Sequence, residues 1–191
     1  MAMATRFRAD TPSDLVLLLL YAGRLQGQQF WSGITRLQKV AYLATEEPAY
    51  AALAGRGEAP ALEFEAYKMG PFTPDIYEAV DTLTSFEPPL VDAAPGSVAG
   101  QDEIETQRYI DEVDPDEVIG AAPRPNRFTL TSSGTKVGQR LWEDASPELR
   151  EVITGLVRRF GRMPLRDLLR YVYLAHPEKT TRSEIKGQLG L

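Results

Sequence analysis

Residues 64–77 read FEAYKMGPFTPDIY, and within this segment a strand pattern changes to a helix pattern. From 62 to 68, apolar and polar residues alternate, which is typical of a half-buried strand. Gly70 and Pro71 end that pattern, because glycine permits a tight turn and proline lacks an amide proton. Residues 73–75 (TPD) then supply a capping threonine, a proline and an acid, so we expect a helix to begin here.

The chain before this segment carries two further helix patterns. Residues 11–14 give the same capping signal and predict a helix through Leu25. Ser32 is positioned to cap a second helix, in which apolar residues recur from 34 to 42 at helical spacing. Residues 48–60 are rich in Ala, Gly and Glu, which leaves a short helix and a mobile loop as alternatives. The apolar face of the first helix is expected to consist of Leu15, Leu18, Leu19 and Ala22.

After the segment, two strand patterns flank a long acidic insertion. Residues 90–91 predict one strand of a hairpin, and residues 127–131 predict its return strand. Ser132 or Ser133 is then expected to cap another helix. The predicted order is typical of a winged helix with an enlarged wing: three helices, a strand, a long tip, a second strand and a further helix.

The sequence therefore predicts an α+β, mainly helical fold in two parts. The first is a winged-helix-like domain over residues 11–145, with an acidic wing insertion at about 92–126. The second is a C-terminal helical extension over residues 146–191. Its elements are expected to begin at Ser146, at Pro164, and at Thr180 or Thr181.

The charge of the chain is distributed unevenly. The formal net charge is -6 at pH 7, which argues against a protein that coats nucleic acid indiscriminately. Between residues 87 and 126 ten acidic residues oppose two arginines, whereas between 147 and 191 nine basic residues oppose five acidic ones. Cysteine is absent from the sequence, which excludes disulfides and thiolate metal sites. The most apolar run, residues 15–21, is far shorter than the roughly 20 residues of a membrane span, so we expect a cytoplasmic protein.

Catalytic and metal-binding arrangements are weakly represented. The only histidine, His176, occupies a predicted helix end, where a cation interacts favourably with the last turn. A zinc site usually needs several histidine or cysteine ligands, and a nucleophile–histidine–acid set needs a histidine placed between the other two groups. With one histidine at a helix end and no cysteine, we expect no enzyme, no metal and no cofactor. Glu63 and Glu65 before Lys68 are similar to the metal strand of some nucleases, but their spacing differs. Residues 111–117 lack the central glycine of a calcium loop.

Two sets of polar and basic residues are candidate DNA contacts. Arginine can bind phosphate or guanine through two hydrogen bonds, and glutamine can read adenine. A solvated helix face explains either set equally well. The sets are Thr35, Arg36, Gln38 and Lys39 on the second helix, and Arg158, Arg159, Arg162, Arg166 and Arg170 in the C-terminal third.

Two motifs of this chain resemble the paired signatures of the YwgA family of phage-associated winged-helix-like proteins. They are residues 34–43 (ITRLQKVAYL) and residues 64–77, whose Gly-Pro core is also similar to that of the Panacea antitoxin domain. Residues 128–134 (FTLTSSG) match the wing strand and turn of such proteins, so the resemblance spans about residues 12–142. It implies a prokaryotic phage-defence or mobile-element setting and a regulatory or toxin-neutralising role. The long acidic wing departs from the family and opposes wing-to-DNA contact, because phosphate repels it.

Two functions are expected from these observations. The first is a non-enzymatic transcription regulator that binds DNA through a basic face, with the C-terminal helices forming a homodimer. The second is a protein-binding module, either an antitoxin or a subunit of an antiviral defence complex, whose acidic wing binds a basic partner. The acidic residues expected to bind that partner are Asp111, Glu112, Asp114, Asp116 and Glu117.

Overall fold

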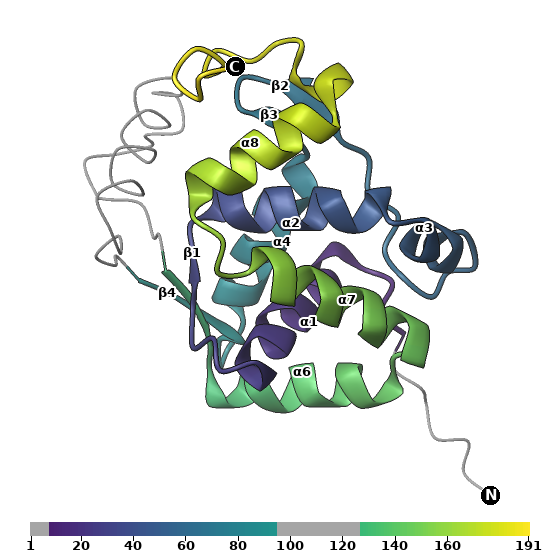
Figure 1. The fold of residues 1–191 in the computed structure, drawn as a ribbon. Coiled ribbons are helices and arrows are strands. Elements are labelled where there is room, and N and C mark those ends of the chain that lie inside the picture. Colours follow the sequence, from purple (N-terminus) through teal and green to yellow (C-terminus); the bar gives the residue numbers. More distant parts are fainter. Residues whose placement is uncertain (1–7, 95–126) are drawn as a thin grey trace, which may run out of the picture.

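The computed structural model describes residues 8–94 and 127–191 and is α+β and mainly helical, as predicted (Figure 1). Helix α1 (Pro12–Leu25) is packed against α4, α6 and α7. Its predicted bounds are confirmed, and Thr11 and Asp14 form a reciprocal capping box at its start. The predicted single apolar face was too narrow, because every residue from Leu15 to Leu20 is buried. A helix surrounded by other helices is apolar on most sides.

A three-stranded antiparallel sheet lies beside α1. It consists of β1 (Trp31–Ser32), β4 (Val91–Ala94) and β5 (Arg127–Leu130), in the order β1-β5-β4. The predicted hairpin is confirmed, since Val91 pairs with Leu130 and Ala94 with Arg127. Strand β1 was not predicted. The inserted residues 95–126, including the predicted wing tip, lie outside the described residues.

Helix α6 (Ser132–Asp144) follows β5 directly. Its N-cap residue is Thr131, so the predicted caps Ser132 and Ser133 were wrong. The Thr131 hydroxyl accepts a hydrogen bond from the amide of Gly134 at 3.0 Å and donates to the carbonyl of Pro89 at 2.7 Å. This residue therefore caps the helix and also ties it to the chain before β4.

The segment 64–77 forms a short hairpin and then a helix. Strand β2 (Glu65–Tyr67) pairs antiparallel with β3 (Gly70–Phe72), and helix α4 (Pro74–Ser85) follows. The strand is shorter than predicted, and Gly70-Pro71, which we expected to end the extended structure, instead begins the second strand. Gly70 has a φ of 86°, which favours glycine, and an added Cβ there would lie 2.9 Å from the ring of Tyr173. The predicted start of α4 is confirmed, with Thr73 as its cap.

Helices α2 (Ile34–Glu46) and α3 (Pro48–Gly55) follow one another with only Glu47 between them. Helix α2 starts after Gly33, which has a φ of 77°, so the predicted Ser32 cap was wrong. Ser32 belongs to β1, where its hydroxyl accepts a hydrogen bond from Arg36 Nε at 3.2 Å. Of the two alternatives for residues 48–60, the structure has the helix in the first part of that segment.

The C-terminal helices complete the core. Helix α7 (Pro147–Phe160) packs on α1, α2 and α3, while α8 (Leu165–Ala175) packs on α2 and β3. The predicted starts at Ser146 and Pro164 are confirmed as the cap positions of these helices. The terminal 3-10 helix η2 (Pro177–Thr180) begins earlier than predicted. Because one buried cluster includes side chains of both parts, residues 146–191 pack as part of the core of residues 11–145.

A pair of hydrogen bonds joins α2 to the segment before α4. The Gln38 side-chain amide donates to the Thr73 carbonyl at 2.6 Å, and its oxygen accepts from the Thr73 amide at 3.2 Å. One amide group thus satisfies a buried backbone donor and a buried backbone acceptor. Leaving such groups without partners costs more than a hydrogen bond contributes on average.

We expect Gln38→Leu to lower the free energy of unfolding by about 1–3 kcal/mol, because both backbone groups of Thr73 lose their partner. Urea denaturation followed by circular dichroism measures this. The matched control is Gln139→Leu, since Gln139 is exposed and bonds only to Glu143 within its own helix. Equal effects of the two substitutions would contradict the role given to Gln38.

We expect Gly134→Ala to lower the free energy of unfolding by about 3 kcal/mol, the upper end for overpacking. An added Cβ at this buried position would lie 1.8 Å from the carbonyl oxygen of Leu90. Gly155→Ala is the control, because nothing lies within 4 Å of an added Cβ there, and it should stabilise by about 0.5–1 kcal/mol. Thermal and urea denaturation of both variants test this packing, and a stable Gly134→Ala protein would contradict it.

Candidate nucleic-acid interface

The predicted DNA contacts on α2 are buried. Thr35, Arg36, Gln38 and Lys39 are each at most 4 % exposed. Lys39 Nζ donates to the carbonyl of Pro71 at 2.8 Å, beside the bonds between Gln38 and Thr73. These side chains cannot reach DNA in this structure, and we remove them from the candidate surface.

Arg36 is held on the other side of α2. Its Nε donates to the carbonyl of Ser32 at 3.3 Å, and its Nη1 donates to the carbonyls of Phe160, at 3.4 Å, and Met163. The helix therefore lies between the β2–β3 hairpin and the turn that joins α7 to α8. A polar helix face usually indicates a face exposed to solvent. Here the polar side chains of α2 donate hydrogen bonds to backbone carbonyls of the hairpin and of the turn.

The C-terminal arginines divide into two groups. Arg159 lies over the rings of Phe160 and Tyr171, at 4.9 and 4.7 Å from their centroids. Arg170 is partly buried and donates to the carbonyl of Leu189. Both side chains have clear roles within the fold. Arg158, Arg162 and Arg166 are exposed, as is Arg159.

Arg162 marks the place where the ends of α1 and α7 meet. Its Nη2 donates to the carbonyl of Gln26, the C-cap residue of α1, at 2.8 Å. The side-chain amide of Gln26 donates to the carbonyl of Thr154 in α7 at 3.3 Å. The side-chain amide of Gln28 donates to the carbonyl of Gly161, directly after α7, at 3.1 Å. Three hydrogen bonds thus hold the C-terminal end of α1 against α7 and the turn that follows it.

Two further arginines lie at this end of the molecule. Arg24, Gln28 and Phe30 line one shallow pocket, and the guanidinium of Arg127 lies 4.3 Å from the centroid of the Phe30 ring. We call Arg24, Arg127, Arg158 and Arg162 the arginine surface. Our sequence prediction missed Arg24 and Arg127, because they come from α1 and β5, and only the fold brings β5 against the chain that follows α1.

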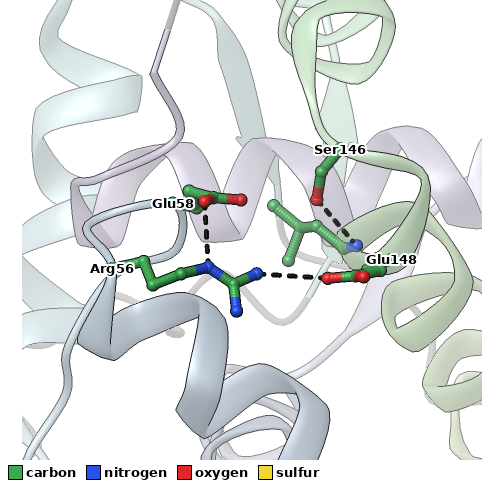
Figure 2. A network of polar contacts seen from close by, with 5 residues as sticks. Arg56, Glu58, Ser146 and Glu148 are labelled. Carbon is green, nitrogen blue, oxygen red and sulfur yellow. Dashed lines mark hydrogen bonds and ion pairs between the residues drawn. The ribbon is translucent and has the colours of Figure 1, made fainter.

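The arginine surface has no ion-pair partner in the described part of the chain. Within residues 8–94 and 127–191, no carboxylate oxygen lies within 4.0 Å of these four guanidinium groups. Arg56 is different: it pairs with Glu58 at 3.0 Å and with Glu148, at the start of α7, at 3.1 Å (Figure 2).

Helix dipoles account for part of this arrangement. Arg24 and Arg158 lie in the last turns of their helices, where a positive charge is favourable by about 0.3–1 kcal/mol. The dipoles do not explain why α1 and α7 bring these arginines together with Arg162, nor why Arg127 lies over Phe30. A surface that carries several positive charges and has no carboxylate partner among the described residues attracts anions.

His176 has the structural position expected of it. It is the C-cap residue of α8, and its ring packs edge-on against Tyr42, with centroids 5.0 Å apart. Its Nδ1 lies 3.6 Å from Glu46 Oε2 and 3.7 Å from Glu178 Oε1. Burial, followed by the nearby charge of Glu46, raises the pKa of Tyr42, so its phenol stays neutral. This cluster joins α2 to the chain end after α8.

Metal chemistry gains no support from the part of the chain that is described. Over those residues no three His, Cys, Asp or Glu side chains are placed to hold a metal ion. Glu63 and Glu65 are exposed at the start of the β2–β3 hairpin. The predicted acidic partner residues 111–117 lie outside the described residues. None of the described helices is long and apolar enough to cross a membrane.

Comparison with known proteins leaves the family of this chain open. Neither a protein-family model, nor a curated protein, nor a solved structure matches it. The interpretation of the arginine surface therefore depends on its own geometry and charge.

Proposed function

We propose that this protein is a non-enzymatic, winged-helix-like regulator that binds nucleic acid through its arginine surface. One observation carries the proposal: around the C-terminal end of α1, Arg24, Arg127, Arg158 and Arg162 have no carboxylate partner among the described residues, although the chain has a net charge of -6. The resemblance to phage-associated proteins favours a role in phage defence or on a mobile element.

The order of elements supports a winged-helix-like arrangement. Helix α1 is followed by β1, α2, α4, β4 and β5, with α3 and the β2–β3 hairpin inserted between α2 and α4. Strand β1 pairs with β5, and β5 pairs with β4, so the two hairpin strands extend from β1. In that arrangement α4 takes the position of the recognition helix, and the residues between β4 and β5 take the position of the wing.

The charge of α4 argues against the usual docking mode. The helix exposes Glu78 and Asp81 and contains no lysine or arginine. A helix of this kind would be repelled by phosphates on both sides of a major groove. We therefore assign the ligand contact to the arginine surface, at the joined ends of α1 and α7.

Guanidinium groups suit a phosphodiester chain. Arginine presents a planar set of donors that binds phosphate oxygens with two hydrogen bonds and stays charged at any physiological pH. Each phosphate that is neutralised releases condensed counterions, so the affinity should fall as salt rises. With four arginines, a logarithmic salt slope of about -3 to -4 is expected for duplex DNA, and a smaller one for single strands.

The double substitution Arg24→Ala and Arg158→Ala should weaken binding to labelled oligonucleotides and reduce the salt slope by about 2, because each arginine is expected to neutralise one phosphate. Fluorescence polarisation across a salt series measures both quantities. Neither side chain makes a described hydrogen bond, so the fold should be unaffected.

The matched control is Arg182→Ala with Lys186→Ala, two exposed cations in the chain after η2. This control removes two positive charges, as the test variant does, but at residues outside the arginine surface. Its affinity for the oligonucleotides should stay close to that of the unaltered protein. If both double variants lose affinity equally, binding follows net charge alone and the proposed surface is wrong.

A second function, a protein-binding module of antitoxin or defence-complex type, is favoured by the acidic face of α4. Glu78→Lys with Asp81→Lys should abolish binding of a basic protein encoded beside this chain, measured by co-purification after co-expression. Thr82→Ala, on the same exposed face, is the control. Retained binding in the charge-reversed variant would exclude α4 as the contact surface.

A further inference from the structure

We infer that the nucleic acid bound by the arginine surface is single-stranded, with Phe30 and Arg127 forming a platform on which one base stacks. The inference rests on the proposed function and names the ligand class of the same surface. It starts from Phe30, an exposed aromatic residue whose ring contacts Arg127 of that surface.

The strand pattern turns Phe30 and Arg127 away from the core. Phe30 directly precedes β1, which begins at Trp31, and Arg127 begins β5. Trp31 and Phe128 pair across the sheet and are 1 % and 3 % exposed. Phe30 is 36 % exposed, and Arg127 is exposed. Because successive side chains of a strand alternate between faces, Phe30 and Arg127 occur together on the solvent side.

The two side chains are stacked on each other. The guanidinium carbon of Arg127 lies 4.3 Å from the Phe30 ring centroid, which is within the range of a cation–π contact. That contact orients the planar guanidinium group, and bases stack on guanidinium planes as well as on aromatic rings. The pair therefore offers a base two planar groups that already contact each other.

Phosphate contacts are available next to this platform. Phe30 and Arg24 line the same shallow pocket, together with Gln28 and Gln29. Gln28 is bonded to Gly161, next to Arg162, whose Nη2 would lie 3.4 Å from a Cβ added at Gly27. A strand that stacks one base at Phe30 thus has cations for its neighbouring phosphates along the α1–α7 junction.

Unpaired bases fit this arrangement better than a duplex. The bases of a duplex are already stacked on one another, so an external platform adds no contact to them, whereas a free base gains about 1–3 kcal/mol from aromatic stacking. The acidic face of α4 opposes major-groove docking, which removes the usual reason for a winged helix to prefer duplex DNA.

The experiment compares Phe30→Leu with the unaltered protein on three labelled probes: oligothymidine, an abasic oligonucleotide of equal length, and a duplex. Leucine keeps apolar bulk but removes the aromatic ring. We expect Phe30→Leu to weaken oligothymidine binding about fivefold or more, the loss of one stacked base, and to leave abasic binding unchanged. Phe30→Trp should retain oligothymidine binding.

Two controls accompany this comparison. Phe86→Leu changes an exposed phenylalanine at the end of α4, which has no ring or cation–π contact among the described residues, and should have no effect on any probe. Arg24→Ala with Arg158→Ala should weaken the oligothymidine and abasic probes alike, since it removes phosphate contacts. Circular dichroism and thermal denaturation establish that each variant is folded.

The outcomes separate the inference from the proposed function. Equal loss on oligothymidine and abasic probes, or no loss on either, overturns the stacking platform. Tighter binding to duplex than to oligothymidine, with the arginine variants still defective, also overturns it and leaves the proposed function standing. Absence of binding to all three probes at low salt overturns both.

Discussion

The structure depends on the buried donors of α2. Gln38 and Lys39 bond to backbone groups of Thr73 and Pro71, while Arg36 bonds to the carbonyls at the end of α7. These bonds fix the β2–β3 hairpin on one side of the helix and the α7–α8 turn on the other. Since unpaired backbone groups are costly in the core, loss of these donors would loosen both neighbours. Residues 34–43 and residues 64–77 are thus hydrogen-bonded to each other.

Local signals predicted much of the fold. Threonine or serine followed by proline marked the starts of α1, α4 and α7, because capping and a fixed proline φ act within a few residues. Strand β1 has only two residues and exists because β5 pairs with it, so no local pattern could predict it. Ser32 was a wrong cap for the same reason: pairing with Arg127 places it in a strand.

The candidate site was predicted less well than the fold. Arg36 and Lys39 have the composition of a DNA-reading helix face, and only the packing of two distant segments shows them to be buried. Arg24 and Arg127 lie more than a hundred residues apart, and the sequence contains no pattern that joins them. Arg158 and Arg162 were predicted because their own segment is basic. Long-range packing therefore decides which charges meet, and local sequence decides which charges exist.

Among the described residues, α4 exposes acids, whereas the arginines around the C-terminal end of α1 have no carboxylate partner. The most direct test of the central claim is a nuclear magnetic resonance titration that follows arginine Nε–Hε signals while oligothymidine is added. The account predicts shifts for Arg24, Arg127, Arg158 and Arg162, with the Arg36 signal unchanged because its group is buried. Shifts confined to other arginines, or none at low salt, would contradict the claim that this surface binds nucleic acid.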